Sequence, residues 1–175
     1  MLYEVREISH PALGFIQVLY ESSFPFRERR EWQQMLSLLS HESMRLMVVV
    51  EENTYVGFAI VWTIGSWHFV EHLAIDPEQR GKQYGSQVMN DIIEYGQHRI
   101  ILEVEPGDDE TAKRRIRFYE KLGLHPVAFT YQQPPYRLGE ESLPMQLMSM
   151  PAITSASKLG AIAQVIKTTV YEAFY

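Results

Sequence analysis

The stretch Arg80-Gly81-Lys82 combines two cations and a glycine at a point where one predicted element ends and another begins. Asp76-Pro77 ends a strand-like apolar run, because proline cannot join a ladder of hydrogen bonds, and a helix is expected to begin near Gln83. The first turn of a helix leaves about four backbone N–H groups without partners and carries roughly half a positive charge. This combination predicts a cradle for a pyrophosphate, with a solvated basic turn as the alternative.

Other ligand patterns fit this chain poorly. A P-loop requires GxxxxGK[ST] and a dinucleotide fold requires GxGxxG, and neither spacing occurs. His68 and His72 are four residues apart on a predicted strand, about 13 Å along it, so they cannot ligate one ion. Cysteine is absent, which removes thiolate ligands and thiol nucleophiles. We therefore expect no metal site.

Hydrophobic periodicity predicts the elements that position the turn. Strands are expected at 3–8, 46–51, 55–64, 67–75, 99–104, 127–131 and 145–150, and helices at 10–24, 28–40, 83–95 and 109–122. Antiparallel strands that are followed by helical crossovers indicate an α/β fold with a mixed sheet and helices on both faces. We expect one domain over residues 1–150, followed by a helical extension over residues 151–175. The apolar side of that helix would pack on the domain or form a homodimer contact.

The composition of the chain limits the kinds of partner that we expect it to bind. The chain has 175 residues, 46% of them hydrophobic, and a net charge of −6 from 16 basic and 22 acidic residues. A negative net charge argues against non-specific nucleic-acid binding and favours a cationic substrate. The start, MLYEVREISH, has no apolar core, and the apolar run at 46–50 is too short to span a bilayer. We expect a cytoplasmic protein without a membrane partner.

Two motifs in this order make the chain resemble the GNAT N-acetyltransferase superfamily. Its signature, [Q/R]-x-x-G-x-[G/A] after a strand, is similar to Arg80-Gly81-Lys82-Gln83-Tyr84-Gly85, and the second hallmark resembles 118–124, FYEKLGL. The resemblance covers roughly residues 1 to 150. The chain departs from the pattern where Gln83 replaces the central glycine, and where Ala112 and Arg115 replace the usual asparagine and alanine upstream of the tyrosine.

The resemblance implies an acetyl-CoA site where two parallel central strands of a mostly antiparallel sheet splay apart. Backbone groups of one strand would pair with the pantetheine arm like an added strand, and the turn would hold the pyrophosphate through its amides. The strand residues are Leu73, Ala74 and Ile75. The turn residues are Arg80, Gly81, Lys82, Gln83, Tyr84, Gly85 and Ser86.

The resemblance also implies direct attack of an amine on the thioester. An alkylammonium of pKa near 10.4 is neutral about once in 10³ molecules at pH 7, so a proton acceptor is needed. Glu71, two residues before Leu73, is the first choice, with a structural carboxylate paired across the sheet as the alternative reading. His72, Glu103 and Glu105 are the other candidates. Tyr119 of the second motif would protonate the departing thiolate.

The acceptor site is expected to combine aromatic and acidic side chains, which suit an amine. Its residues would be Phe26, Trp32, Glu103 and Tyr136. The acceptor would be a small-molecule amine or a protein amine. Two further functions stay open: a CoA-binding regulatory module without turnover, and an acyltransferase that uses another acyl-CoA.

Overall fold

The computed structural model describes residues 1–174, and these form two compact units. The first unit comprises Met1–Thr63 and Val70–Ile92. The second comprises Ile64–Phe69 and the described chain from Ile93 onward. The C-terminal helix falls in the same unit as the late strands.

The first unit begins with an antiparallel meander. The hairpin between its second and third strands turns at Glu52 and Asn53, both with positive φ (45° and 61°), as a tight hairpin turn requires. Leu2 lies opposite Val49, and Met44 lies opposite Trp62. The elements are β1 (Leu2–Val5), α1 (Leu13–Ser23), η1 (Phe26–Glu28), α2 (Trp32–Ser37), β2 (Met44–Glu51), β3 (Thr54–Ile64), β4 (Trp67–Ile75), η2 (Pro77–Gln79) and α3 (Tyr84–Tyr95).

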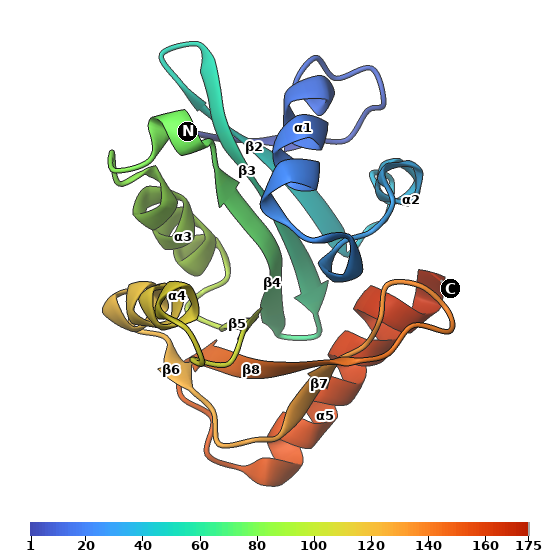
Figure 1. Cartoon of the computed structure of the whole chain (residues 1–175), viewed down its shortest axis with the longest axis vertical. Coiled ribbons are helices and arrows are strands. Elements are labelled where there is room, and N and C mark those ends of the chain that lie inside the picture. Colours follow the sequence, from blue (N-terminus) through green and yellow to red (C-terminus); the bar gives the residue numbers. More distant parts are fainter. Residues whose placement is uncertain (175) are drawn as a thin grey trace. The chain divides into compact units, whose positions relative to one another are not determined.

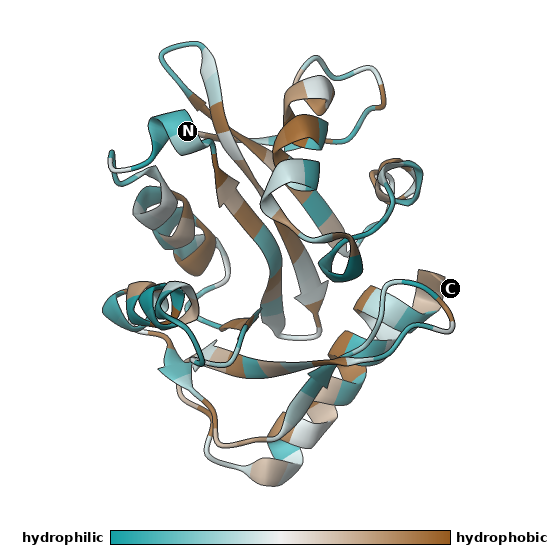
Figure 2. Cartoon of the chain, viewed as in Figure 1, coloured by the Kyte–Doolittle hydropathy of each residue, from teal (hydrophilic) through white to brown (hydrophobic). Residues whose placement is uncertain are grey.

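The core of the first unit follows from its hydrophobic pattern. Helix α1 buries Leu13, Ile16, Leu19 and Tyr20, which recur every three or four residues. Strand β3 is buried along most of its length, and Figure 2 shows hydrophobic residues along β3 and β4. Strand β3 is therefore interior, whereas buried and half-buried residues alternate along most of β4.

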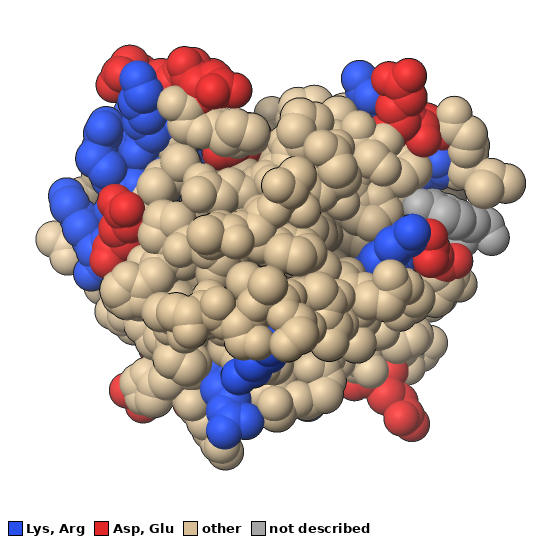
Figure 3. All heavy atoms as spheres, turned by 90° about the horizontal axis from the view of Figure 1, so that it is seen from below, with Lys and Arg blue, Asp and Glu red and all other residues tan. Residues whose placement is uncertain are grey.

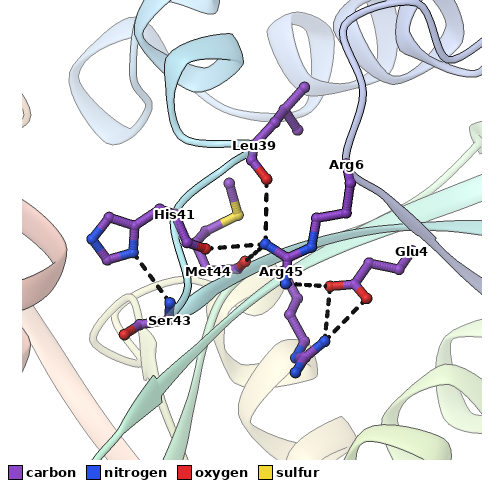
Figure 4. A network of polar contacts seen from close by, with 7 residues as sticks. All are labelled: Glu4, Arg6, Leu39, His41, Ser43, Met44 and Arg45. Atoms are coloured by element: carbon purple, nitrogen blue, oxygen red, sulfur yellow. Dashed lines mark hydrogen bonds and ion pairs between the residues drawn. The ribbon is translucent and has the colours of Figure 1, made fainter.

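A polar network ties the chain start to the loop after α2 (Figure 4). The Arg6 guanidinium donates to the carbonyl oxygens of Leu39, His41 and Met44 at 3.1 to 3.2 Å. Its other terminal nitrogen lies 2.7 Å from Glu4, which also accepts from Arg45 at 2.8 Å. Arg6 thereby satisfies two carbonyls of the loop after α2 and one at the start of β2.

In the second unit, β8 is the strand to which the others pair. It is antiparallel to β5, β6 and β7, with Ile100 opposite Met150 and Tyr131 opposite Met145. The elements are β5 (Ile100–Val104), α4 (Glu110–Lys121), β6 (His125–Pro126), β7 (Tyr131–Gln133), β8 (Leu143–Met150), α5 (Ala156–Ile166), a π-helical turn η3 (Lys167–Tyr171) and η4 (Glu172–Phe174).

The strands form one hydrogen-bonded order, β1-β2-β3-β4-β5-β8-β6, with β7 on β8 (Figure 1). Strand β4 belongs to both units, and within the second unit its His68 N–H donates to Arg99 O at 2.8 Å. Because the connection from β4 to β5 runs through helix α3, these two strands are the parallel pair in a mostly antiparallel sheet. The predicted mixed α/β class is confirmed.

Several predicted boundaries are wrong. No strand spans 127–131: the structure has the two short strands β6 and β7 instead, both of which pair with β8. The strand predicted at 3–8 ends at Val5, and the helix predicted at 28–40 shrinks to α2. The extension is helical as expected. Its apolar residues Leu159, Ile162, Ile166 and Val170 are buried within the chain, while Tyr175 lies outside the described residues.

Candidate active site

The predicted phosphate turn lies between η2 and α3 in the first unit (Figure 1). Gly81 and Gln83 both have positive φ, 82° and 65°. The first backbone bond of the helix joins Gln87 N–H to Gln83 O at 3.1 Å. The amides of Tyr84, Gly85 and Ser86 come before that bond, so they have no intrahelical acceptor.

These groups fit a pyrophosphate. The three first-turn amides supply donors and the helix dipole favours an anion. The cations are tethered within the turn: Arg80 Nε donates to Ile75 O at 3.3 Å, and Lys82 Nζ donates to Gln79 at 2.7 Å. The Gln83 side chain is exposed, and its left-handed backbone is the conformation that a glycine adopts without strain. Gln83 therefore occupies the backbone conformation that the glycine of the family pattern would favour.

The end of β4 packs closely against β3. Asp76 N–H donates to Val56 O at 2.9 Å. A Cβ on Gly57 would lie 2.5 Å from Ala74 O and 2.7 Å from the Ile75 side chain. Only a glycine therefore permits this approach, and Gly57 sets the position of the backbone that was predicted to pair with pantetheine.

Glu71 of β4 lies in a buried ion pair. Its side chain and that of Arg30 are both 0% exposed, and Arg30 Nη2 lies 3.2 Å from Glu71 Oε1. Trp62 Nε1 donates to the other carboxylate oxygen at 2.6 Å, and the Arg30 guanidinium lies 5.6 Å from the Trp62 ring centre. This geometry agrees with the alternative reading of Glu71, a structural carboxylate with a partner across the sheet.

Aromatic side chains enclose this pair. The Tyr20 hydroxyl accepts from Arg30 N–H at 2.8 Å, and burial raises the pKa of Tyr20 above its usual value. His72 Nε2 lies 3.0 Å from Glu28 O, and the ring contacts Phe24 edge-on at 4.2 Å. Burial lowers the pKa of His72, against the opposing pull of Glu71. His72 is therefore held neutral.

Tyr119 lies on helix α4 in the second unit. It is 9% exposed, and the structure gives its hydroxyl no hydrogen bond among residues 1–174. Burial raises its pKa to about 12. The smaller effect of Arg115 lowers the pKa, and that of Glu105 raises it. The phenol therefore keeps its proton at neutral pH, as the predicted acid must.

The basic side chains of α4 are mostly neutralised locally. Lys113 and Arg117 lie 3.2 and 3.9 Å from Glu110, and Arg115 pairs with Glu105. Figure 3 shows blue and red side chains next to one another in several places on the face drawn. The helix thus presents mixed charges, rather than a cationic surface of one sign.

Glu103 of β5 is the other polar centre of the second unit. Tyr131 OH donates to Glu103 Oε1 at 2.5 Å. Gln133 Nε2 and Tyr171 OH donate to Glu103 Oε2 at 2.7 and 2.9 Å. The charge of Glu103 and burial together raise the pKa of Tyr131, burial most strongly. Glu103 thus accepts from three neutral donors, whereas Glu71 is paired with a permanent cation.

The predicted acceptor residues fall in both units. In the first, Phe26 is 52% exposed and Trp32 lies 6.2 Å from the Tyr20 ring. In the second, Tyr136 is buried and lies 4.9 Å from the Tyr171 ring, which connects it to Glu103. Trp32 thus lies beside the aromatic shell of Glu71, and Tyr136 lies beside a donor of Glu103.

Sequence reasoning missed Arg30, Gln133 and Tyr171. An arginine in a charged run, RERR, is usually exposed, and Gln133 stands in what was expected to be a loop. Tyr171 lies 68 residues from Glu103. The available signals were weak: a second arginine beside Arg29, and a tyrosine on the predicted apolar side of the extension.

A family model described as the acetyltransferase (GNAT) family matches residues 3–124. That match covers more than half of the chain and includes the turn before α3 and the helix that carries Tyr119. The chain belongs to the GNAT acetyltransferase family. It is therefore an acyltransferase, as the two motifs predict.

Solved structures resemble this acetyltransferase over 86% to 98% of its length. One from Bacteroides thetaiotaomicron, assigned to the GNAT acetyltransferases, is 29% identical, has a TM-score of 0.89 and covers 98% of both chains. An aminoglycoside 6'-N-acetyltransferase complexed with coenzyme A is 17% identical, with a TM-score of 0.62 over 89% of this chain and 98% of that one. A GNAT acetyltransferase from Elizabethkingia anophelis, with acetyl-CoA bound, is 14% identical, with a TM-score of 0.58 over 86% and 96%. The last two share the fold alone.

Comparison with curated sequences found no relative. Within residues 1–174, no helix combines the length and apolar character needed to cross a bilayer. The same residues contain no group of three or more His, Cys, Asp or Glu side chains arranged to hold a metal ion.

Proposed function

We propose that this acetyltransferase moves the acetyl group of acetyl-CoA to a primary amine by direct attack. The observation that supports it most is the turn before α3, where the amides of Tyr84, Gly85 and Ser86 lack intrahelical acceptors and face no carboxylate in the first turn of the helix. Backbone from Leu73 to Ile75 would bind the pantetheine arm, and Arg80 to Ser86 would bind the pyrophosphate. Acetyl-CoA supplies the acetyl group as a thioester.

Tyr119 is the proposed acid. Its pKa of about 12 keeps the phenol protonated, and its hydroxyl has no other hydrogen bond among the described residues. A proton held at Tyr119 Oη would pass to the departing sulfur. A crystal structure with acetyl-CoA would test this role of Tyr119.

A carboxylate must take the proton of the ammonium, and the geometry favours Glu103 over Glu71 for this step. Arg30 occupies Glu71 Oε1 and never releases its proton at neutral pH. Glu103 instead accepts from two hydroxyls and an amide, and a hydroxyl can also accept a hydrogen bond from an ammonium. Glu71 would then position the strand, and its role as the base is the alternative.

Two variants separate these roles. Glu103→Gln should lower kcat by about 10²-fold or more, the usual loss of a general base. Glu71→Gln should act mainly on thermal stability, with a smaller loss of kcat at temperatures well below melting. The reverse ranking of the two kcat values would assign the base to Glu71.

The function itself is tested by thiol release. Wild-type protein and acetyl-CoA are incubated with a panel of alkylamines, polyamines, amino sugars and peptides with free N-termini, and free CoA is read with a thiol reagent. The chain has no cysteine, so the protein adds no background. Release with at least one amine, and acetylation of that amine by mass spectrometry, are expected.

The other two functions give different results in the same assay. A regulatory CoA-binding module would bind acetyl-CoA by calorimetry and release no thiol with any amine. An enzyme with another acyl donor would turn over succinyl-CoA or a longer acyl-CoA faster than acetyl-CoA. Absence of both binding and release would remove the proposal.

A further inference from the structure

The Glu103 carboxylate is held by side chains from two other elements of the second unit. Tyr131 and Gln133 come from β7, and Tyr171 comes from the π-helical turn that follows α5. Their three hydrogen bonds to Glu103 span 2.5 to 2.9 Å, and all three donors are neutral. Glu103 thus accepts hydrogen bonds from two phenol hydroxyls and one amide, none of which carries a positive charge.

Gln133 has a fixed orientation in this cluster. Its Nε2 donates both to Glu103 Oε2 at 2.7 Å and to Tyr171 OH at 3.1 Å. The flipped amide would bring its oxygen against a carboxylate oxygen, so this assignment is settled by the network. Gln133 is 6% exposed, and its Oε1 is buried with no hydrogen-bond partner within residues 1–174. A buried acceptor left in this state is costly unless a ligand donates to it.

Tyr171 is delivered by the C-terminal segment. Ile166, Val170 and Tyr171 are each at most 1% exposed, and the Tyr136 ring contacts the Tyr171 ring at 4.9 Å. π-Helical turns occur often at functional sites. Tyr131, Gln133 and Tyr171 all lie beyond residue 124, where the family match ends.

We propose that the C-terminal segment completes the acceptor site, with Tyr171 as a positioning residue that holds Glu103 as the receptor of a protonated primary amine. An ammonium has three N–H donors and no acceptor. The Glu103 carboxylate and Gln133 Oε1 provide two acceptors, and the tyrosine rings provide faces that attract a cation. This inference rests on the proposed function, because it names the residues that select its substrate.

Kinetics test the inference with an amine from the panel. Tyr171→Phe removes one hydroxyl, and we expect its KM for the amine to rise about 10-fold, the effect of one hydrogen bond to a charged group, with the KM for acetyl-CoA unchanged. Gln133→Met should act in the same direction. The controls are Thr168→Ala, which is exposed on the same segment, and Tyr3→Phe, which removes an exposed hydroxyl in the first unit. Unchanged amine KM in Tyr171→Phe and Gln133→Met would overturn the inference, as would equal rises in both KM values.

Ligand-observed NMR tests it without turnover. Saturation transfer is measured for 2-phenylethylamine and hexylamine, and for the alcohols 2-phenylethanol and 1-hexanol, with protein that holds no acetyl-CoA. We expect transfer to the amines in wild type, a smaller transfer in Tyr171→Phe and none to the alcohols. Equal transfer to amines and alcohols would overturn the inference. Thiol release with unchanged amine KM rejects the inference alone, while amine selectivity without thiol release rejects the proposed function alone.

Discussion

Arg30→Met should destabilise the protein far more than a surface arginine change. The substitution removes the cation from a pair in which both side chains are 0% exposed, and it leaves the Glu71 carboxylate buried with Trp62 as its remaining donor. Breaking a buried ion pair from one side costs about 3–5 kcal/mol. For a chain of this length each kcal/mol shifts Tm by about 2–4 °C, so Tm should fall by about 6–20 °C.

The assay is differential scanning calorimetry with two matched variants. Arg27→Met alters an exposed arginine three residues earlier, and we expect a change in Tm of less than about 2 °C, since surface changes stay within roughly 0.5 kcal/mol. The double variant Arg30→Met/Glu71→Gln removes both charges while the amide oxygen still accepts from Trp62, so it should melt above Arg30→Met. A loss in Arg30→Met no larger than that in Arg27→Met would refute the buried pair.

Four further predictions follow from single contacts. Tyr119→Phe should lower kcat about 10²-fold with little change in acetyl-CoA affinity; equal kcat would remove Tyr119 from the mechanism. Gln83→Gly should raise Tm by a few degrees, because a non-glycine residue at a φ of 65° carries about 1 kcal/mol of strain that glycine avoids. A lower Tm in this variant would contradict the prediction. Gly57→Ala should lower the free energy of unfolding by about 1–3 kcal/mol and weaken acetyl-CoA binding measured by calorimetry. Its control is Gly14→Ala, because a Cβ on Gly14 would contact nothing within 4 Å. Equal effects of the two substitutions would refute the close contact between β3 and β4. Burial lowers the pKa of His72 from 6.5. The unfolded chain therefore binds this proton more tightly, and the free energy of unfolding should fall as pH drops below about 6.5. In urea melts at pH 5 to 7, His72→Gln should lessen that fall, and an unchanged pH dependence would argue against this role of His72.

Local patterns of the sequence predicted the parts of the site that are continuous in the chain. Strand β4 has the predicted bounds, Trp67–Ile75, and α3 begins one residue after the predicted start. The turn that carries Gly81 is formed by neighbouring residues, so proline, glycine and helix-start signals were sufficient to place it. The helix of Tyr119 was likewise marked by its periodicity and by Gly123, which has a φ of 87°.

Partners that are distant in sequence were beyond such patterns. Arg30 meets Glu71 across 41 residues, and Tyr171 meets Glu103 across 68. Hydrophobic periodicity assigns faces to elements, but it does not say which polar residue on one element meets which on another. Both of these contacts involve residue types that are normally exposed or amphipathic, so their burial follows from tertiary structure alone.

The most direct measurement is acetyl-CoA affinity of a variant in the first turn of α3. Ser86→Asp places a carboxylate among the amides that would hold the pyrophosphate, at a position where an acidic residue also favours the helix. Asn90→Asp adds the same charge to the same helix one turn later, at an exposed position. By titration calorimetry, wild type and Asn90→Asp should bind acetyl-CoA with similar Kd, and Ser86→Asp should bind at least about 10-fold more weakly, since two like charges in contact cost more than 1.4 kcal/mol. Equal affinity of the two variants, or no binding by wild type, would contradict the account.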